Sequence, residues 1–263
     1  MMTRRRAEIV GAGFAGLTAA CALAQRGWQV RVHERSERLR TEGAGIYIYE
    51  NGLRVLEAVG AYEAAIAGAP PARTREVRDE GNRVVAVHRW TGSRVFSIIR
   101  QNVINALAAA ATAAGAEVVT GEAAVAASAD GGLTLSTGER LQADLVVGAD
   151  GSNSAVRKSL GIATKRRPLV DGCTRMLMPA LPEENHGDAG KTIEYWSGTR
   201  RLLYTPCSDR EVYIALTMLD SDAAAKEVPV RREVWQAAFP HLRALIDRFG
   251  DQGRYDRFEM ISL

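Results

Sequence analysis

The sequence predicts an α/β fold in which a Rossmann-like nucleotide domain is interrupted by an antiparallel sheet. Three observations lead to this prediction. A strand, a glycine-rich turn and a helix open the chain, short strands alternate with a long helix up to Gly148, and strand-like segments without long helices follow from Pro168. We therefore expect a nucleotide domain formed by residues 1–72 and 97–167, and a substrate domain formed by residues 73–96 and 168–263.

Composition limits the function classes. Of 263 residues, 46% are hydrophobic and 25% are charged, which is typical of a globular protein. The net charge of +3 is too small to indicate nucleic acid or an anionic membrane as partner. Cys21, Cys173 and Cys207 are widely spaced, which indicates neither a disulfide framework nor a metal site. Because no signal peptide or membrane-length apolar run is visible, we expect a cytoplasmic protein.

The first strand, Glu8–Val10, runs into a G-x-G-x-x-G motif made of Gly11, Ala12, Gly13, Phe14, Ala15 and Gly16. Gly11 allows the sharp turn, Gly13 allows the backbone to approach a pyrophosphate, and Gly16 allows close packing of helix on strand. The helix expected from Phe14 to Gln25 directs its free N–H groups at the pyrophosphate. A simple glycine-rich turn is the alternative for the motif alone.

The second strand, Trp28–His33, ends in Glu34, at the distance beyond the motif where an acid binds an adenosine ribose. A 2′-phosphate would be repelled, so the bound nucleotide is not expected to be NADP. His33 itself is expected to be an ordinary strand residue. Strand, glycines, helix and terminal acid in register favour a dinucleotide site over a plain turn.

The next segments alternate between the two predicted domains. A strand is expected after Gly45 and a helix over Asn51–Val59, and Pro70 and Pro71 mark a boundary. Thr74–Val95 contains two extended runs that predict an antiparallel excursion. A long helix over Asn102–Ala114 and four short strands follow. The last of these, Leu141–Gly148, is apolar enough to be buried on both faces.

The second half of the chain predicts mostly strands. From Pro168 the strand-like segments are CTRMLMPAL, TIEYWSG, RLLYTPC and EVYIALTML. A helix interrupted at Pro240 comes after them.

Three elements together resemble a known family. GAGFAG with Glu34, Arg100 at the start of the long helix, and Gly148–Gly151 with Ser154 and Arg157 are similar to the single-component FAD-dependent aromatic hydroxylases, the p-hydroxybenzoate and salicylate hydroxylase group. GAGIYIYENGLRVLEAVGA, LLYTPC and RYDRFE most resemble the pyridine-ring oxygenases within it, 2-methyl-3-hydroxypyridine-5-carboxylate oxygenase and 5-pyridoxate oxygenase. The fold implied is a Rossmann-like FAD-binding domain interrupted by an antiparallel substrate-binding sheet.

The resemblance implies residues that hold FAD. The adenosine half would lie on the motif residues Gly11, Gly13, Phe14, Ala15 and Gly16 and on Glu34, with Arg35 beside the adenine. Arg100 and Asp150, with Gly151 next to it, would reach the ribityl and pyrophosphate groups. Gly43 to Ile46, including Gly45, would run under the isoalloxazine ring. From the residues alone, the D-G-S-N sequence at Asp150 also reads as a capped turn.

The resemblance also implies a chemistry. FAD would be reduced by NADH or NADPH, react with dioxygen to a C4a-hydroperoxide, and insert one or both oxygen atoms into a hydroxylated, carboxylated ring. The substrate expected is a small N-heteroaromatic acid of the pyridine type. The alternatives are a salicylate-type benzenoid hydroxylase and a truncated, non-catalytic FAD-binding remnant. No metal is needed, and the sequence does not indicate the oligomeric state.

Arg201, Tyr213 and Tyr47 are the substrate-site candidates. By the resemblance, Arg201 would bind a carboxylate, Tyr213 would orient the ring or its hydroxyl, and Tyr47 would line the cavity between ring and flavin. Strand tyrosines are more often core or rim residues, and strand arginines are often solvated. Arg73 or Arg75 stands where the pyridine-ring enzymes have an aromatic hydroxyl, which favours a more anionic ring.

One motif of the family is not found. The family carries a G-D pair followed by small residues and a proline, which closes over the flavin. The sequence reaches Leu263 before the place where that motif is expected. Because that motif contacts the flavin in the family, FAD affinity and activity of the sequence as given are the properties to test first.

Overall fold

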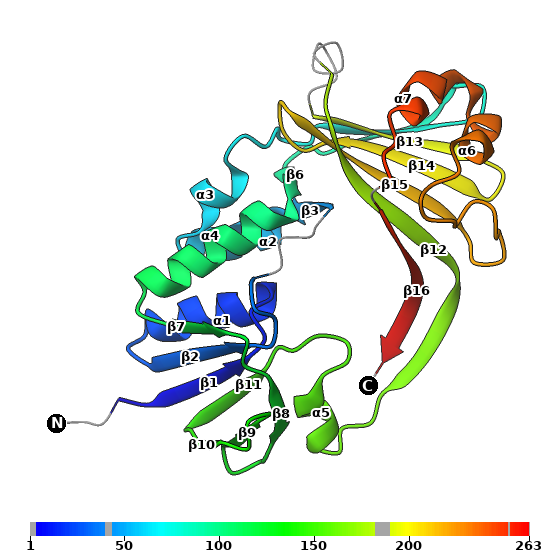
Figure 1. Cartoon of the computed structure of the whole chain (residues 1–263). Helices are drawn as coiled ribbons and strands as arrows, with labels where there is room; N and C mark the ends of the chain where they lie inside the picture. The colour runs from blue at the N-terminus through cyan, green and yellow to red at the C-terminus, as the bar shows by residue number, and fades with distance from the viewer. Residues whose placement is uncertain (1–3, 40–43, 182–189, 252, 263) are drawn as a thin grey trace.

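The computed structural model describes residues 4–39, 44–181, 190–251 and 253–262. A four-stranded parallel sheet lies at one end of the molecule and a seven-stranded sheet at the other (Figure 1). A two-stranded pair lies between them, and the long strand β12 (Lys165–Pro179) runs from the end with the parallel sheet to the seven-stranded sheet. This mixed arrangement confirms the predicted α/β fold class.

The parallel sheet has the strand order β11-β1-β2-β7. Its strands are β1 (Arg6–Val10), β2 (Gln29–Glu34), β7 (Glu117–Thr120) and β11 (Leu145–Gly148). Helix α1 (Phe14–Ala24) packs on one face through Leu17, Ala20 and Cys21, and α4 (Arg100–Ala113) packs against α1. The close helix–strand approach is what the small residues of α1 allow.

The opposite face of this sheet contacts a small antiparallel sheet. Its order is β10-β9-β8, with strands β8 (Ala124–Ala127), β9 (Gly132–Leu135) and β10 (Arg140–Gln142). Val10 of β1 packs there with Leu133, Leu135 and Val156, the last from α5 (Ala155–Ser159). The predicted strand Leu141–Gly148 was wrong, because Ala143 and Asp144 divide it between these two sheets. Since β11 is an edge strand, it is half-buried and not buried on both faces.

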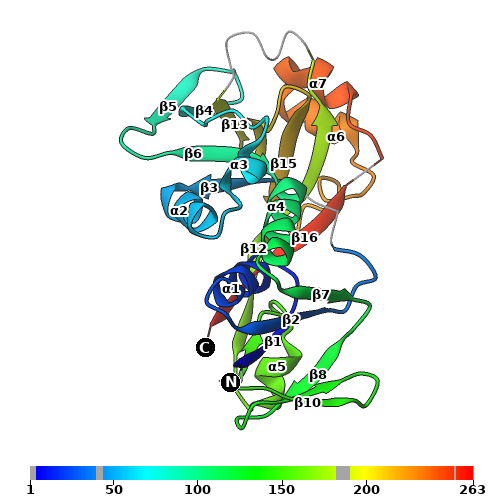
Figure 2. The ribbon, with the colours of Figure 1, turned by 90° about the vertical axis from the view of Figure 1, so that its left-hand side faces the viewer.

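The two-stranded pair joins β3 (Gly45–Tyr49) to β6 (Val95–Ile99) in antiparallel register. The helices α2 (Glu50–Ala58) and α3 (Tyr62–Ile66) follow β3, and α3 was not predicted. Figure 2 shows β3 and β6 next to the hairpin of β4 (Thr74–Arg78) and β5 (Val84–Arg89). The hairpin is antiparallel as predicted.

The seven-stranded sheet has the order β16-β12-β15-β14-β13-β4-β5. Its remaining strands are β13 (Lys191–Ser197), β14 (Arg200–Pro206), β15 (Glu211–Leu219) and β16 (Arg254–Ser262). One face is covered by α6 (Arg232–Ala238), the 3₁₀ turn η2 (Pro240–Leu242) and α7 (Arg243–Asp247), which break at Pro240 as expected. Alternate strand residues such as Ile214 and Leu216 pack under Trp235 and Phe239 there.

The other face of this sheet is turned toward β3. It carries Tyr213 and Arg201, which the strand registers place on the side opposite the α6–α7 core. No helix among the described residues is long and apolar enough to cross a membrane.

Candidate active site

The glycine-rich turn is shaped for a phosphate group. Gly11 has φ +100°, and a Cβ on it would lie 2.5 Å from the carbonyl oxygen of Ala149. A Cβ on Gly16 would collide with the carbonyl of Gly11. Gly13 differs, because no described heavy atom lies within 4 Å of the position its Cβ would take. The space next to Gly13, at the uncapped N-terminus of α1, therefore fits a pyrophosphate.

Glu34 closes this turn from the end of β2. Its carboxylate accepts hydrogen bonds from the backbone N–H of Ala12 at 2.9 Å and of Ser36 at 3.0 Å. Burial alone would raise the pKa of Glu34, but these N–H donors outweigh it and lower the pKa below its usual range. The ionised carboxylate keeps lone pairs for ribose hydroxyls. Arg35 beside it is exposed.

One carboxylate oxygen of Asp150 accepts hydrogen bonds, and the other has no partner among the described residues. Its Oδ2 accepts hydrogen bonds from the N–H groups of Ala155, at 2.6 Å, and Val156, at 3.3 Å, so the predicted capped turn is real. Its Oδ1 is buried and meets no hydrogen-bond partner among the described residues. A buried carboxylate oxygen requires a donor, and a hydroxyl of the FAD ribityl chain is a suitable one. Gly151 follows with φ +84°.

Arg100 connects α4 to the glycine-rich turn. Its guanidinium stacks on the ring of Phe14, with 4.9 Å from Cζ to the ring centroid. Its backbone N–H donates to the carbonyl of Ala44 at 3.2 Å. Ala15 is exposed on the first turn of α1. The structure thus brings the first glycine motif, the start of α4 and the residues before β3 together.

Gly45 is the point where β3 meets the seven-stranded sheet. A Cβ on Gly45 would lie 2.6 Å from Cys207 Sγ and 2.8 Å from Tyr213 Cβ, so only glycine allows this approach. Ile46 is half-buried and pairs with Ile98. Gly43, which was also expected under the isoalloxazine ring, lies outside the described residues.

Tyr213 is buried on β15 between Leu177 of β12 and Thr205 of β14. Burial is the largest effect and raises the pKa of its phenol to about 12, although a hydrogen bond with Arg175 opposes the rise. Tyr213 is therefore protonated at neutral pH and can orient a ring oxygen, but it cannot serve as a base. Arg175 was not anticipated, because nothing in its local pattern points at Tyr213.

Tyr47 of β3 reaches across to two strands. Its hydroxyl lies 3.0 Å from Thr192 Oγ1 of β13 and 2.5 Å from Thr205 Oγ1 of β14. Burial raises its pKa, although the two threonine hydrogen bonds oppose that rise. Because Thr205 stands opposite Tyr213 in the strand register, Tyr47 and Tyr213 belong to one region of the sheet.

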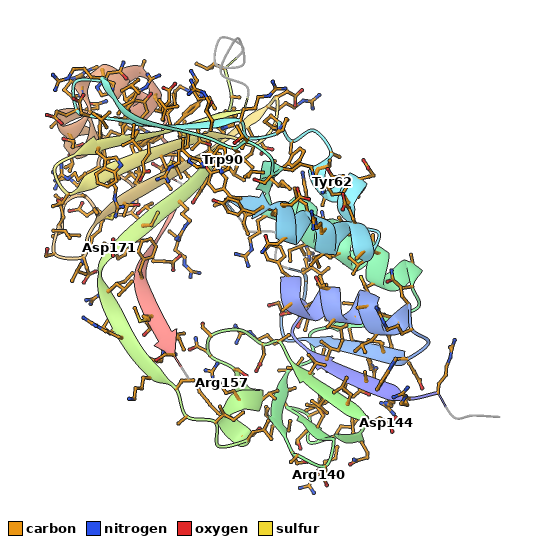
Figure 3. The ribbon with its side chains drawn as sticks, turned by 180° about the vertical axis from the view of Figure 1, so that it is seen from behind. Tyr62, Trp90, Arg140, Asp144, Arg157 and Asp171 are labelled. Carbon is orange, nitrogen blue, oxygen red and sulfur yellow. The ribbon has the colours of Figure 1, made fainter. Side chains whose placement is uncertain are left out.

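Arg201 lies on the same sheet face but farther away. It pairs with Thr217 in register, four residues along β15 from Tyr213, which corresponds to about 13 Å. Its guanidinium forms an ion pair with Asp171 at 3.2 Å and stacks over Trp196 at 5.2 Å. Arg201 and Tyr213 were each expected to contact the substrate, and the structure places them on one sheet face without direct contact between their register positions. Figure 3 shows Asp171 on β12, away from Trp90.

A cavity of about 480 Å³ is lined in part by Tyr47, and neither Gly45 nor Tyr213 belongs to its lining. We call it the Trp90 cavity. Aromatic and apolar side chains and one ion pair line it: Tyr47, Tyr49, Trp90, Leu203, and Arg75 with Glu194. His88 completes the wall and packs edge-on against Trp90 with ring centroids 5.3 Å apart. In Figure 3, Trp90 lies where the seven-stranded sheet meets the β3–β6 pair.

His33 is more than a strand residue. Its Nε2 lies 2.6 Å from Glu8 and its Nδ1 lies 2.6 Å from Glu122, with both His33 and Glu8 buried. Both ring nitrogens must donate, so the imidazole is charged. The His33 carbonyl accepts the N–H of Gly11 at 2.8 Å, which connects this charged cluster to the nucleotide turn.

Comparison with known proteins agrees with this geometry. Residues 5–248 match the family described as FAD binding domain. A putative 2-heptyl-3-hydroxy-4(1H)-quinolone synthase of Rhodococcus erythropolis is 44% identical over 98% of this chain and 68% of its own. A 2-heptyl-3-hydroxy-4(1H)-quinolone synthase of Mycobacteroides abscessus is 41% identical over 100% of this chain and 72% of its own.

Among solved structures, the tetrameric form of 2-methyl-3-hydroxypyridine-5-carboxylic acid oxygenase superposes with a TM-score of 0.93. It is 41% identical and covers 98% of this chain and 71% of its own. The nucleotide turn, the orphaned oxygen of Asp150 and these similarities agree on the cofactor. The chain belongs to the FAD-binding family of aromatic monooxygenases, flavoenzymes that typically use NAD(P)H and dioxygen.

Proposed function

We propose that this monooxygenase hydroxylates an uncharged N-heteroaromatic ring of the 4-quinolone class. The reaction would add the ring hydroxyl that appears in the names of the two quinolone synthases described above. The proposal departs from the carboxylated pyridine expected from the sequence, and the charges on the sheet face that carries Tyr213 are the reason.

Three arginines on this face already have carboxylate partners. A substrate carboxylate requires a guanidinium whose charge is available. Each of these side chains is instead paired with a carboxylate of the protein: Arg201 with Asp171 at 3.2 Å, Arg175 with Asp256 at 3.6 Å, and Arg75 with Glu194. An anionic substrate would have to compete with a protein carboxylate for each of these three guanidiniums, and a neutral ring would not have to break an ion pair. This observation carries the proposal.

FAD supplies the oxygen-transfer chemistry when it is bound. The residues of the chain would position the substrate and keep water away. Gly45 permits close approach to Tyr213, and the protonated phenol of Tyr213 would donate a hydrogen bond to the ring carbonyl oxygen. Tyr47, held by Thr192 and Thr205, would fix the wall beside the ring.

FAD binding and substrate binding are assigned to different sheets of the fold. We assign FAD binding to residues 1–72 and 97–167, which include the glycine-rich turn and Asp150. We assign substrate binding to residues 73–96 and 168–263, which include the β4–β5 hairpin and β12 to β16. The β12–β16 pairing, with Lys165 opposite Ser262, extends the second unit back toward the first.

A carboxylated pyridine is the second candidate. Its support is the 41% identity to the pyridine-carboxylate oxygenase, with Arg201 as the carboxylate ligand. That role would require Arg201 to exchange Asp171 for the substrate.

Substrate-stimulated NADH oxidation by the FAD-loaded protein separates these candidates. A 2-alkyl-4-quinolone, a 3-hydroxypyridine carboxylate and salicylate would each be added, and the products would be checked by mass spectrometry under ¹⁸O₂. A quinolone product heavier by one ¹⁸O atom is expected. Labelled product from the pyridine acid or salicylate alone would overturn the proposal. If the protein retains no FAD at all, the non-catalytic alternative holds.

A further inference from the structure

We propose that the Trp90 cavity binds an alkyl chain carried by the substrate ring, and that Trp90, Tyr49 and Leu203 determine which chain lengths are accepted. This inference rests on the proposed function and deepens it. The alkyl chain is the part of the substrate that does not react, and the Trp90 cavity is the place where it would bind.

The walls of the cavity suit a hydrocarbon chain. Tyr49, Trp90, Tyr47 and Leu203 present aromatic and aliphatic surface. The charged groups in the wall, Arg75 and Glu194, are paired with each other and therefore require no ligand of opposite charge. A volume of about 480 Å³ lies within the range of small-molecule sites. An apolar ligand is thus favoured over an anion.

The cavity is next to the expected ring position but separate from it. The ring must lie against the flavin, on the side of β3 where Gly45 meets Tyr213. Neither Gly45 nor Tyr213 lines the Trp90 cavity, whereas Tyr47, two residues after Gly45 on β3, does. A substituent that extends past Tyr47 would enter the cavity, while the ring itself would stay outside it.

Leu203 connects the two regions. It lines the Trp90 cavity and also packs against the buried cluster that contains Tyr213 and Cys207. The residue opposite Leu203 on the neighbouring strand β13 is Glu194, which also lines the cavity. A chain attached to a ring near Tyr213 therefore has an apolar path along Leu203 toward Trp90.

The inference is tested with 2-alkyl-4-quinolones that carry methyl, propyl, pentyl and heptyl chains. KM and kcat for stimulated NADH oxidation would be measured in the wild type, Trp90→Ala and Leu203→Trp. Val87→Ala is the matched control, because Val87 is exposed on the opposite side of β5 from His88. In the wild type, KM should fall by up to about fourfold for each methylene that becomes buried.

The expected result is selective for chain length. Trp90→Ala and Leu203→Trp should raise KM for the heptyl compound at least tenfold and leave the methyl compound and kcat nearly unchanged, while Val87→Ala behaves as wild type. Equal effects on methyl and heptyl compounds would overturn the cavity assignment alone. If no quinolone stimulates NADH oxidation in the wild type, the proposed function fails and the assignment fails with it.

Discussion

The carboxylate of Glu34 accepts a hydrogen bond from the backbone N–H of Ala12 at 2.9 Å, and this contact joins the end of β2 to the nucleotide turn. One acidic residue therefore shapes the turn and presents its remaining lone pairs to a ribose. Glutamine would keep one oxygen acceptor for the Ala12 N–H, but it would lose the negative charge and the acceptor of the Ser36 N–H.

Glu34→Gln is expected to weaken FAD binding by roughly tenfold or more, the effect of losing a charge-assisted hydrogen bond. Its melting temperature should fall slightly, because one of the two backbone N–H groups that Glu34 accepts would lose its acceptor. FAD affinity is measured by quenching of flavin fluorescence. Unchanged affinity would show that Glu34 serves only the turn.

Gly13→Val should remove FAD binding without unfolding the protein. Its Cβ would enter the open space next to α1, where the pyrophosphate is expected. Gly16→Ala is the contrasting variant, because its Cβ would collide with the Gly11 carbonyl and destabilise the fold. Flavin content after desalting and the melting temperature separate the two effects. A flavin-bound Gly13→Val protein would contradict the pyrophosphate position.

Asp150→Asn tests the orphaned carboxylate oxygen. Asparagine can still accept the N–H of Ala155 through its carbonyl, but it places a donor where Oδ1 accepts in the wild type. We expect weaker FAD binding at nearly constant stability. Asp150→Ala should in addition lose about 1 kcal/mol of stability with the cap. Equal FAD affinity in the wild type and Asp150→Asn would show that Oδ1 does not contact the cofactor.

Stability should depend on pH through His33. Burial lowers the pKa of His33, but hydrogen bonds with Glu8 and Glu122 outweigh burial and raise the pKa above the usual 6.5. The stability that the charged His33 contributes is therefore complete below pH 6.5. It is lost as the pH rises through the raised pKa. Burial raises the pKa of Glu8, but His33 and Arg6 lower it below 4.5, so its contribution is lost only as pH falls through that lowered value. The contribution of the His33–Glu8 pair to the free energy of unfolding is therefore complete between pH 4.5 and pH 6.5.

His33→Gln is the matching variant for this pH dependence. It should cost about 3 kcal/mol, because it leaves the buried carboxylate of Glu8 and the half-buried carboxylate of Glu122 without their shared cation. It should also flatten the decline in the free energy of unfolding above pH 6.5. Urea denaturation between pH 5 and pH 9 measures both effects. A variant that keeps the wild-type slope would exclude His33 as the group responsible.

The three cysteines should resist alkylation in the native protein. All are buried, and burial raises their pKa values, that of Cys207 to about 12. Thiolate is the reactive form, so little of it exists at pH 8. Mass spectrometry after iodoacetamide treatment should show no label in the native state and three labels after denaturation. Rapid native labelling of Cys207 would mean that the Gly45 contact opens.

Local patterns in the sequence were sufficient for the nucleotide half. Gly11, Gly13 and Gly16 act through backbone geometry over a few residues, and Glu34 follows at a fixed spacing. The local patterns of the segments that form β12 to β15 likewise predicted strands. The division of Leu141–Gly148 between two sheets was missed, because both halves have the same local pattern and only their partners differ.

The side-chain partners of Arg201 and His33 could not be predicted, because they come from segments that are distant in the sequence. The sequence indicated Arg201 as a carboxylate ligand, but it could not show that Arg201 forms an ion pair with Asp171 of β12. His33 resembles an ordinary strand residue until Glu8 and Glu122 are brought to its two nitrogens.

By itself, the sequence determined the fold class, the cofactor and the general chemistry, because those depend on motifs whose residues are close along the chain. Only the tertiary structure decided which charges are neutralised and where a cavity forms. The Trp90 cavity takes its walls from β3, the β4–β5 hairpin, β13 and β14, which meet through sheet order and register. Side chains that lie more than a hundred residues apart, such as Tyr47 and Thr192, become neighbours only when these strands pair.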